Sequence, residues 1–311
     1  MSITNIDVTL RDGGYRNGFT FPDGYAGEHA RLSVKAGFDW VEIAYRNGSF
    51  NPAISRGMTG LGPNDYIAEI ADIIGAEHIG LILHPANITS GDLQECYTAG
   101  ARLVRMCLSV TDPGPGLRYV SEAREMGFAV CVNFTRASRL DARSLVDLSS
   151  RSAESGANAI YLADSNGSMQ PGEVSRRVTL VQDVSGLDVG FHAHNNLGLA
   201  LANSLAAAHA GAAWMDSSIL GMGKGSGNLI SEQWIAHLER HHSDPGVFDL
   251  GALLDLSAHL RDSVPESTPV LPHTDLLLGR FDLSVEHSDR VSADRRSQVH
   301  VARELGRLAV A

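Results

Sequence analysis

The sequence has little positive charge for its length. Aspartate and glutamate outnumber lysine and arginine by 36 to 25, which gives a formal net charge of -11. Such a chain repels a phosphate backbone, so nucleic acid is excluded as a partner. Of the 311 residues, 43% are hydrophobic and 20% are charged. This composition is typical of a globular protein with a large core.

Cysteines are few and long apolar runs are lacking. The three cysteines, Cys96, Cys107 and Cys131, have no CxxC spacing, and two of them lie in apolar runs, where a thiol behaves as a small hydrophobic side chain. No run of about 18 apolar residues is present to span a bilayer. Residues 1–7 lack the basic start and apolar centre of a signal peptide. We therefore expect a cytoplasmic protein with no membrane partner.

Apolar runs of strand length alternate with helical patterns along most of the chain. The predicted strands are 3–10, 40–45, 78–84, 103–110, 129–135, 159–165, 189–195 and 214–220, and segments with helical periodicity follow them, the last at 228–238. Eight such repeats with largely apolar strands predict a (β/α)8 TIM barrel over residues 1–240. A doubly wound open sheet is the alternative, but no GxGxxG follows the first strand.

The pattern changes after the barrel. From residue 241 onward, proline-punctuated segments show helical periodicity. Residues 241–311 are therefore predicted to form a short helical C-terminal extension, which either caps the barrel or makes contacts in a homo-oligomer.

A His-x-His pair, His192 and His194, ends the seventh predicted strand. Side chains two apart on a strand point the same way, so both imidazoles can face one point. Asp12 follows the first strand, and the carboxyl ends of barrel strands share one face. The three side chains predict a two-histidine, one-carboxylate site for Mn2+ or Mg2+ first, and also for Co2+, Zn2+ or Fe2+. A satisfied pair of core histidines is the alternative.

Charged residues near the predicted ligands are candidates for substrate contact. Arg11 brings a fixed positive charge to where an oxyanion develops, unless it only forms a structural ion pair. Glu42 is a base, an anchor or a partner of Arg11. Arg105 lies in an apolar strand, where a charge needs a partner. We take Glu42, Arg105 and Lys224 as the substrate-binding candidates.

A glycine-rich loop, 221–228, follows the eighth strand and contains Lys224. Its backbone amides can approach an anion, with Lys224 as a point charge, although a tight turn explains the glycines equally well. Asn228 at its end is either a further metal ligand or the cap of the next helix.

Three motifs, in this order, resemble the DRE-TIM metallolyase superfamily. They are 9–14 (TLRDGG), 192–195 (HAHN) and 221–228 (GMGKGSGN). The resemblance covers roughly residues 3–240 and is closest to the 4-hydroxy-2-oxovalerate aldolase-like branch. It implies a divalent-metal-dependent class II aldolase, which cleaves or forms 4-hydroxy-2-oxo acids from a 2-oxo acid and an aldehyde through a metal-bound pyruvate enolate.

The resemblance also implies roles for single residues. Asp12, His192 and His194 match the metal ligands, and Arg11 matches the arginine that stabilises the enolate. Asn228 stands where some relatives have an extra ligand.

The chain departs from this branch at its acid/base position and in its tail. Tyr15 stands where related aldolases commonly carry a histidine acid/base, and a phenol is a better acid than base. Tyr15 is therefore predicted to be catalytic as a proton donor. Related aldolases also have a long C-terminal domain with a catalytic tyrosine and a docking surface for an aldehyde dehydrogenase. Here no tyrosine follows Tyr161, which argues against that partner.

Two alternatives to an aldolase stay open. The first is an acyl-CoA-dependent Claisen synthase or lyase of the 2-isopropylmalate synthase or HMG-CoA lyase type. Against it, residues 224–227 lack the cysteine that HMG-CoA lyases place there, and Gly14 stands where the synthases carry glutamate. The second alternative is a metal-binding barrel without catalysis.

Overall fold

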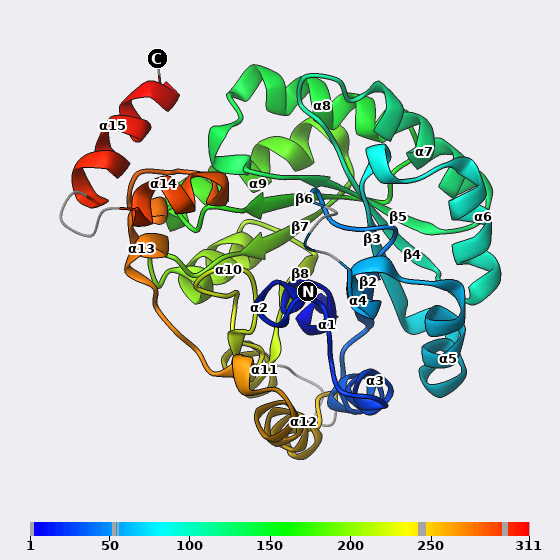
Figure 1. Cartoon of the computed structure of the whole chain (residues 1–311). Coiled ribbons are helices and arrows are strands. Elements are labelled where there is room, and N and C mark those ends of the chain that lie inside the picture. The colour runs from blue at the N-terminus through cyan, green and yellow to red at the C-terminus, as the bar shows by residue number, and fades with distance from the viewer. Residues whose placement is uncertain (1–2, 52–53, 55, 242–246, 294–297, 311) are drawn as a thin grey trace.

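The computed structural model shows a closed barrel of parallel strands. It describes residues 3–51, 54, 56–241, 247–293 and 298–310. The strands pair in sequence order, and β1 also pairs with β8 (Figure 1). They are β1 (Thr4–Asp7), β2 (Trp40–Tyr45), β3 (Ile79–Leu83), β4 (Leu103–Cys107), β5 (Ala129–Phe134), β6 (Ala159–Asp164), β7 (Asp188–Ala193) and β8 (Trp214–Ser217). The predicted (β/α)8 TIM barrel is confirmed.

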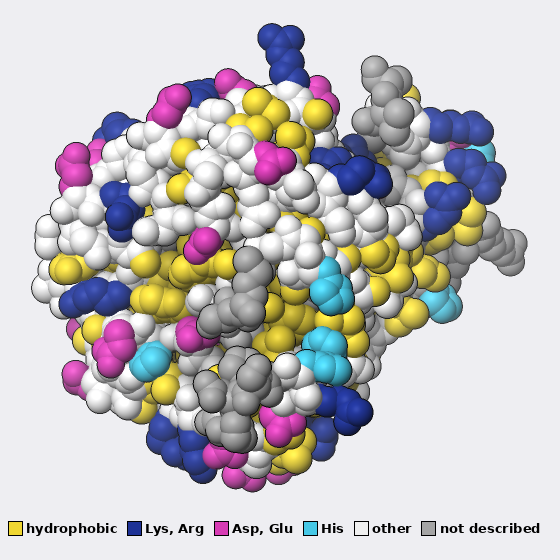
Figure 2. Space-filling model, turned by 180° about the vertical axis from the view of Figure 1, so that it is seen from behind, with side chains coloured by type: hydrophobic (Ala, Val, Ile, Leu, Met, Phe, Trp, Pro, Cys, Tyr) yellow, Lys and Arg dark blue, Asp and Glu magenta, His cyan; other side chains and the backbone are white. Residues whose placement is uncertain are grey.

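Helices surround the strands and alternate with them along the chain (Figure 1). The outer helices are α3 (Tyr25–Ala36), α5 (Asn64–Ile74), α6 (Ser90–Ala99), α7 (Gly114–Glu125), α8 (Ala142–Glu154), α9 (Pro171–Ser185), α10 (Ala200–His209) and α11 (Ser231–His241). Shorter helices follow β1 and β2, namely α1 (Thr9–Asp12), α2 (Gly14–Asn17) and α4 (Met58–Leu61). On the surface seen from behind, acidic and basic side chains are interspersed, and hydrophobic side chains gather near the middle (Figure 2).

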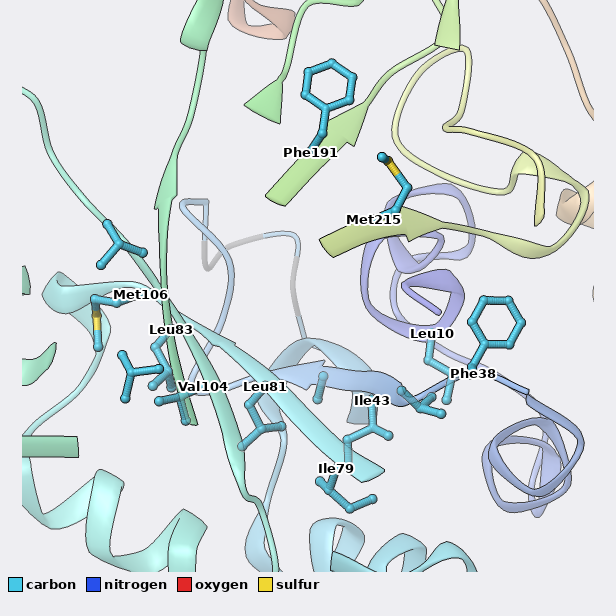
Figure 3. Close-up of a cluster of buried hydrophobic side chains, with 14 of the residues drawn as sticks. Leu10, Phe38, Ile43, Ile79, Leu81, Leu83, Val104, Met106, Phe191 and Met215 are labelled. Atoms are coloured by element: carbon cyan, nitrogen blue, oxygen red, sulfur yellow. The ribbon is translucent and has the colours of Figure 1, made fainter. Parts of the chain in front are cut away.

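Alternate residues of each strand face either the helices or the barrel interior. On β4, Val104 and Met106 pack with the main core between strands and helices (Figure 3). Leu103 belongs instead to a separate apolar cluster inside the barrel. Because side chains alternate, Arg105 and Cys107 also face the interior. The barrel interior is therefore apolar at its amino end and becomes polar toward the carboxyl ends of the strands.

The chain after α11 adds helices α12 (Leu250–Ser263), α13 (His273–Arg280), α14 (Ser288–Ser292) and α15 (Gln298–Val310). Helix α12 packs beside α3 (Figure 1). Around α13 to α15 a small separate core forms from Leu278, Leu283, Val291, Ala302 and Leu305. The predicted helical character of the tail is thus confirmed in its described part; residues 242–246, 294–297 and 311 lie outside it, and the boundary at residue 240 stays a prediction.

The first strand is shorter than predicted, and the last barrel helix begins and ends three residues later than predicted. Strand β1 ends at Asp7 because the Asp7 carboxylate accepts a hydrogen bond from the Thr9 backbone N at 2.9 Å, which turns the chain into α1. Helix α11 begins at Ser231 rather than at 228, because the preceding residues form isolated β-bridges, one of them between Asn228 and His194. Within the described residues, no helix is long and apolar enough to cross a membrane.

Candidate active site

Three candidate metal ligands meet at the carboxyl end of the barrel. Asp12 comes from α1, directly after β1, and His192 and His194 come from the end of β7. Their ligand atoms all lie within 4.8 Å of one another, and the three side chains are buried. The two imidazole centroids are 4.9 Å apart, as the strand spacing requires. The structure therefore brings together the residues that the sequence predicted as ligands.

Helix α1 holds the Asp12 carboxylate in place because its first residue, Thr9, is hydrogen-bonded to neighbouring elements. The Thr9 hydroxyl accepts a hydrogen bond from the Ile219 backbone N, just after β8, at 2.9 Å. The Asp7 carboxylate, which binds the Thr9 backbone, also contacts His29 Nε2 at 2.7 Å and accepts from the Ser33 hydroxyl at 2.6 Å, both on α3. One buried carboxylate thus fixes β1, α1 and α3 relative to one another.

A chain of buried ion pairs runs beneath the candidate ligands. Arg11 Nη1 lies 2.6 Å from Asp12 Oδ1, and Arg11 Nη2 lies 2.8 Å from Glu42 Oε2. The other oxygen of Glu42 is 3.0 Å from Arg105 Nε. Arg105 in turn donates from both terminal nitrogens to the Asp216 carboxylate, at 2.5 and 2.8 Å. Because positive and negative charges alternate along this series of ion pairs, each buried charge has a partner that offsets its desolvation.

The series of buried ion pairs ends at Asp216 on β8, next to His192. Asp216 Oδ2 lies 2.8 Å from His192 Nδ1, which leaves Nε2 of that ring as the nitrogen that can bind a cation. Sequence reasoning missed Asp216. The signal was present, because a carboxylate within a short barrel strand has to be buried and therefore needs a partner.

Asn228 fits the same site as a further ligand. Its Nδ2 donates to Asp12 Oδ2 at 2.9 Å, and the Lys224 backbone N donates to the same oxygen at 3.2 Å. Among the described residues, the Oδ1 of Asn228 is a buried acceptor without a hydrogen-bond partner. A buried amide oxygen beside a carboxylate is a group that a hard cation satisfies. The carboxylate, amide and imidazole donors together suit a divalent cation, and Asn228 does not cap α11, which begins three residues later.

Burial and charge keep Asp12 and His194 in forms that bind cations. Burial opposes ionisation of Asp12, but the Arg11 guanidinium and the neighbouring histidines outweigh it, so the pKa of Asp12 is lowered. Burial also lowers the pKa of His194 to about 3, which leaves this ring neutral at neutral pH. A carboxylate and a neutral imidazole are the protonation states that a metal needs.

Tyr15, Tyr45 and Lys224 lie beside the ligands. The Tyr45 hydroxyl is 3.5 Å from both the Tyr15 hydroxyl and Arg11 Nη1. Burial raises the pKa of Tyr15 to about 12, so the phenol keeps its proton at neutral pH. Lys224 Nζ lies 5.9 Å from the ring centroid of Tyr15 and 5.8 Å from that of Phe50. Two aromatic faces thus hold the ammonium group near the site.

A cavity of about 450 Å3 lies next to these residues, and His84, Cys107 and Lys224 contribute to its lining. His84 and Cys107, at the ends of β3 and β4, are hydrogen-bonded to each other. Asn133 Nδ2 donates to Cys107 Sγ at 3.6 Å. Burial would raise the pKa of Cys107, but the His84 contact outweighs it and the pKa is lowered. The expectation that this cysteine is only a small hydrophobic side chain therefore misses its surroundings.

The comparisons with known proteins agree with the geometry. Residues 117–260 match the HMGL-like family model. The chain is 33% identical over 277 residues to 4-hydroxy-2-oxovalerate aldolase 4 of Rhodococcus opacus (strain B4), with 89% of this chain and 80% of that relative covered. The chain belongs to the HMGL-like family, among the 4-hydroxy-2-oxovalerate aldolases. The predicted resemblance to the metallolyases is thereby confirmed.

One further relative supports this membership, and one solved structure supports the fold. The HMGL-like chain is 32% identical over 252 residues to the 4-hydroxy-2-oxovalerate aldolase of Carboxydothermus hydrogenoformans, with 81% of this chain and 75% of that relative covered. Its fold matches the N-terminal domain of a proposed aldolase from Bacteroides vulgatus with a TM-score of 0.83 at 24% identity, over 96% of this chain and 99% of that domain. At that identity, the solved structure supports the fold alone.

The predicted substrate-binding residues take different positions in this HMGL-like barrel. Lys224 lines the cavity. Glu42 and Arg105 are fully buried below it, and each is ion-paired on more than one side. Their predicted contact with substrate, like the roles of the other site residues, stays a prediction.

Proposed function

We propose that this chain is a divalent-metal-dependent class II aldolase, which cleaves or forms 4-hydroxy-2-oxo acids from a 2-oxo acid and an aldehyde. The observation that carries the proposal is the buried triad of Asp12, His192 and His194 with the Arg11 guanidinium against it. The names of the aldolase relatives support the same reaction. When bound at the triad, the cation would supply Lewis-acid polarisation of the 2-oxo acid carbonyl.

Arg11 supplies the fixed positive charge that the reaction needs. When the methyl group of pyruvate loses a proton, negative charge develops on the carbonyl oxygen, and a preoriented cation stabilises it without reorganisation. Glu42 and Asp12 hold the guanidinium from two sides. Burial opposes the charge of Arg11, yet these carboxylates outweigh it and raise its pKa well above the usual value, so the group stays charged.

Tyr15 is the proposed proton donor to the aldehyde oxygen. Since its pKa is about 12, the phenol is protonated at neutral pH and can donate to the alkoxide that forms as the carbon-carbon bond is made. The Tyr45 hydroxyl lies 3.5 Å from both the phenol oxygen and Arg11 Nη1, so it links the two groups.

Three further residues are assigned by their contacts. Lys224 is proposed to bind the carboxylate of the 2-oxo acid, because its ammonium group is held beside the triad at the cavity wall. The contacts of Glu42 and Arg105 support a positioning role, with Glu42 fixing Arg11 and Arg105 fixing Asp216.

The donor atoms of the site indicate which cation it would bind. Carboxylate and amide oxygens beside two imidazoles favour Mn2+ or Mg2+, with Co2+ and Zn2+ as further candidates.

A homo-oligomer, a cytoplasmic location and the lack of an aldehyde dehydrogenase partner stay predictions. The acyl-CoA alternative has less support, since the curated relatives above are named aldolases.

The first experiment follows the methyl protons of pyruvate by NMR in deuterated buffer with Mg2+. We expect the enzyme to exchange them for deuterium, and Arg11→Ala to slow the exchange about a hundred-fold or more, because a charged group that faces the developing oxyanion is lost. Arg11→Lys retains a point charge but loses the pairing with carboxylates on two sides. Its exchange rate should therefore lie between those of the parent and Arg11→Ala.

Arg31→Ala is the matched control, since Arg31 is an exposed arginine on α3 that is ion-paired only at the surface, to Glu28. It should exchange pyruvate as the parent does. If the parent enzyme leaves the methyl signal unchanged with Mg2+ and with Mn2+, the aldolase assignment is wrong.

A further inference from the structure

The cavity extends well beyond the candidate metal site. It lies over the carboxyl ends of β3 to β6 and is closed on one side by Val285 and Glu286 of the C-terminal segment. A smaller pocket, lined by His194, shares Asn166, Lys224 and Val285 with it. The cavity therefore lies directly beside the triad, with Lys224 in the wall of both pockets.

The cavity is large for the small aldehyde that 4-hydroxy-2-oxovalerate would release. That acid divides at its carbon-carbon bond into pyruvate and acetaldehyde. A water molecule takes about 30 Å3 in the liquid and a bonded atom takes less, so acetaldehyde, with roughly three non-hydrogen atoms, fills less than about 90 Å3. The cavity offers about 450 Å3. Acetaldehyde would leave most of this space to water.

The lining indicates what kind of group fills the remaining space. Its apolar members come from several loops: Phe50, Pro85, Ala86, Leu108, Pro115 and Val285. At the exposed rim, Arg136 and Glu286 pair at 3.6 Å with about half of each side chain accessible, whereas the charged Lys224 lies at the end next to the triad. A lining with this many apolar side chains favours a ligand with an apolar body over a short polar one.

The wall contributed by the C-terminal segment is fixed in place. Asp282 Oδ1 accepts hydrogen bonds from Ser138 Oγ at 2.8 Å, Asn166 Nδ2 at 2.8 Å and Ser168 Oγ at 2.7 Å. These donors lie in the loops after β5 and β6. The segment that carries Val285 is thus attached to the barrel loops that line the same cavity, and the cavity is preformed.

We propose that this cavity is the aldehyde subsite, and that its acceptor is an aldehyde with an apolar chain of roughly four to eight carbon atoms. The inference rests on the proposed aldolase function. The carbonyl end of the aldehyde lies toward Lys224 and the triad. Its chain runs past Leu108 and Pro115, and Val285 covers it from the side of the C-terminal segment.

The experiment measures carbon-carbon bond formation between pyruvate and a series of straight-chain aldehydes, from acetaldehyde through butanal and hexanal to octanal. Each methylene that moves from water to an apolar wall strengthens binding by about four-fold at full burial. We expect kcat/KM to rise two- to four-fold per added methylene up to about hexanal, mainly through KM. A flat or falling series from acetaldehyde onward overturns the inference.

Two variants that narrow the cavity test its location. Ala86→Phe and Val285→Phe add bulk to the lining at two positions far apart in the sequence, and each should lower the hexanal-to-acetaldehyde ratio of kcat/KM at least ten-fold. Leu254→Phe, at an exposed position on α12, is the control for the same added bulk and should keep the parent ratio. An unchanged ratio in both cavity variants overturns the inference.

Pyruvate methyl exchange separates the two proposals, because it needs no aldehyde. If the parent exchanges pyruvate but shows no preference for longer aldehydes, the subsite inference alone fails. If exchange is absent, the aldolase proposal fails and the inference fails with it.

Discussion

Asp216 acts on the candidate metal site through its neighbours. Its carboxylate faces His192 Nδ1 on one side and the Arg105 guanidinium on the other. Burial opposes its charge, but these contacts outweigh that effect and lower the pKa of Asp216. A charged acceptor at Nδ1 fixes the tautomer and the orientation of the ring. Asp216 is therefore a positioning residue for a ligand.

We expect Asp216→Asn to weaken Mn2+ binding by about ten- to hundred-fold, because a neutral amide orients the His192 ring less strongly than a carboxylate does. Isothermal titration calorimetry measures the affinity. The control is Asp188→Asn, an exposed aspartate at the amino end of β7 whose carboxylate accepts from Trp214 Nε1 at 3.2 Å. That variant should bind Mn2+ as the parent does. Equal affinities for Asp216→Asn and the parent would contradict the positioning role.

The three cysteines differ in their surroundings although all are buried. Cys107 lines the cavity and is hydrogen-bonded to His84, and its pKa is lowered. Burial raises the pKa of both Cys96 and Cys131 to about 12. The thiolate is the reactive form, so these differences predict very different reactivities.

We expect iodoacetamide to alkylate Cys107 at least ten-fold faster than Cys96 or Cys131 in the folded protein near pH 7.5. Peptide mapping by mass spectrometry over a time course measures the three rates. His84→Gln removes the imidazole partner and should slow the reaction at Cys107. Labelling of Cys96 or Cys131 before Cys107 would show that the cavity does not expose this thiol.

The strands could be predicted from the sequence because buried parallel strands are continuous apolar runs. Strand β2 was predicted at 40–45 and lies at Trp40–Tyr45. The carboxyl end of β4 was placed too late, at 110 rather than at Cys107. Leu108, just after the strand, packs in the main core and also lines the cavity, and hydrophobicity alone does not distinguish that position from a strand. Sequence patterns therefore locate the strands better than the loops that carry the site.

The ligands could be predicted because local spacing determines their geometry. His192 and His194 are two residues apart on one strand, so their common direction follows from the chain itself. The ion pairs that hold these ligands in place could not be predicted in the same way. Arg105 and Asp216 are 111 residues apart, and only the closed register of the barrel brings them together. Long-range pairs of this kind depend on tertiary structure.

At the scale of the whole molecule, the C-terminal segment forms part of the cavity wall. The segment that joins α13 to α14 meets the barrel at Asp282, which binds the loops after β5 and β6. Gly279 on α13 lies so close to Asn196 that an added Cβ would come within 2.7 Å of its side chain. The Asn196 side chain also donates to the Asp275 backbone oxygen at 2.9 Å. The extension and the barrel are therefore joined at several points around the site.

Removal of the Asp282 carboxylate should loosen this junction. Asp282→Ala deletes the acceptor of three hydrogen bonds, each of which contributes about 0.5–1.5 kcal/mol, so opening of the segment becomes easier by roughly ten-fold or more. Hydrogen–deuterium exchange should show reduced amide protection in α13 and at Leu283. The strands of the barrel should keep their protection, because they do not depend on this contact. Asp289→Ala, at an exposed position on α14, removes the same group away from the junction and should exchange as the parent does. Equal protection of α13 in both variants would mean that the small apolar core around Leu278 holds the wall without Asp282.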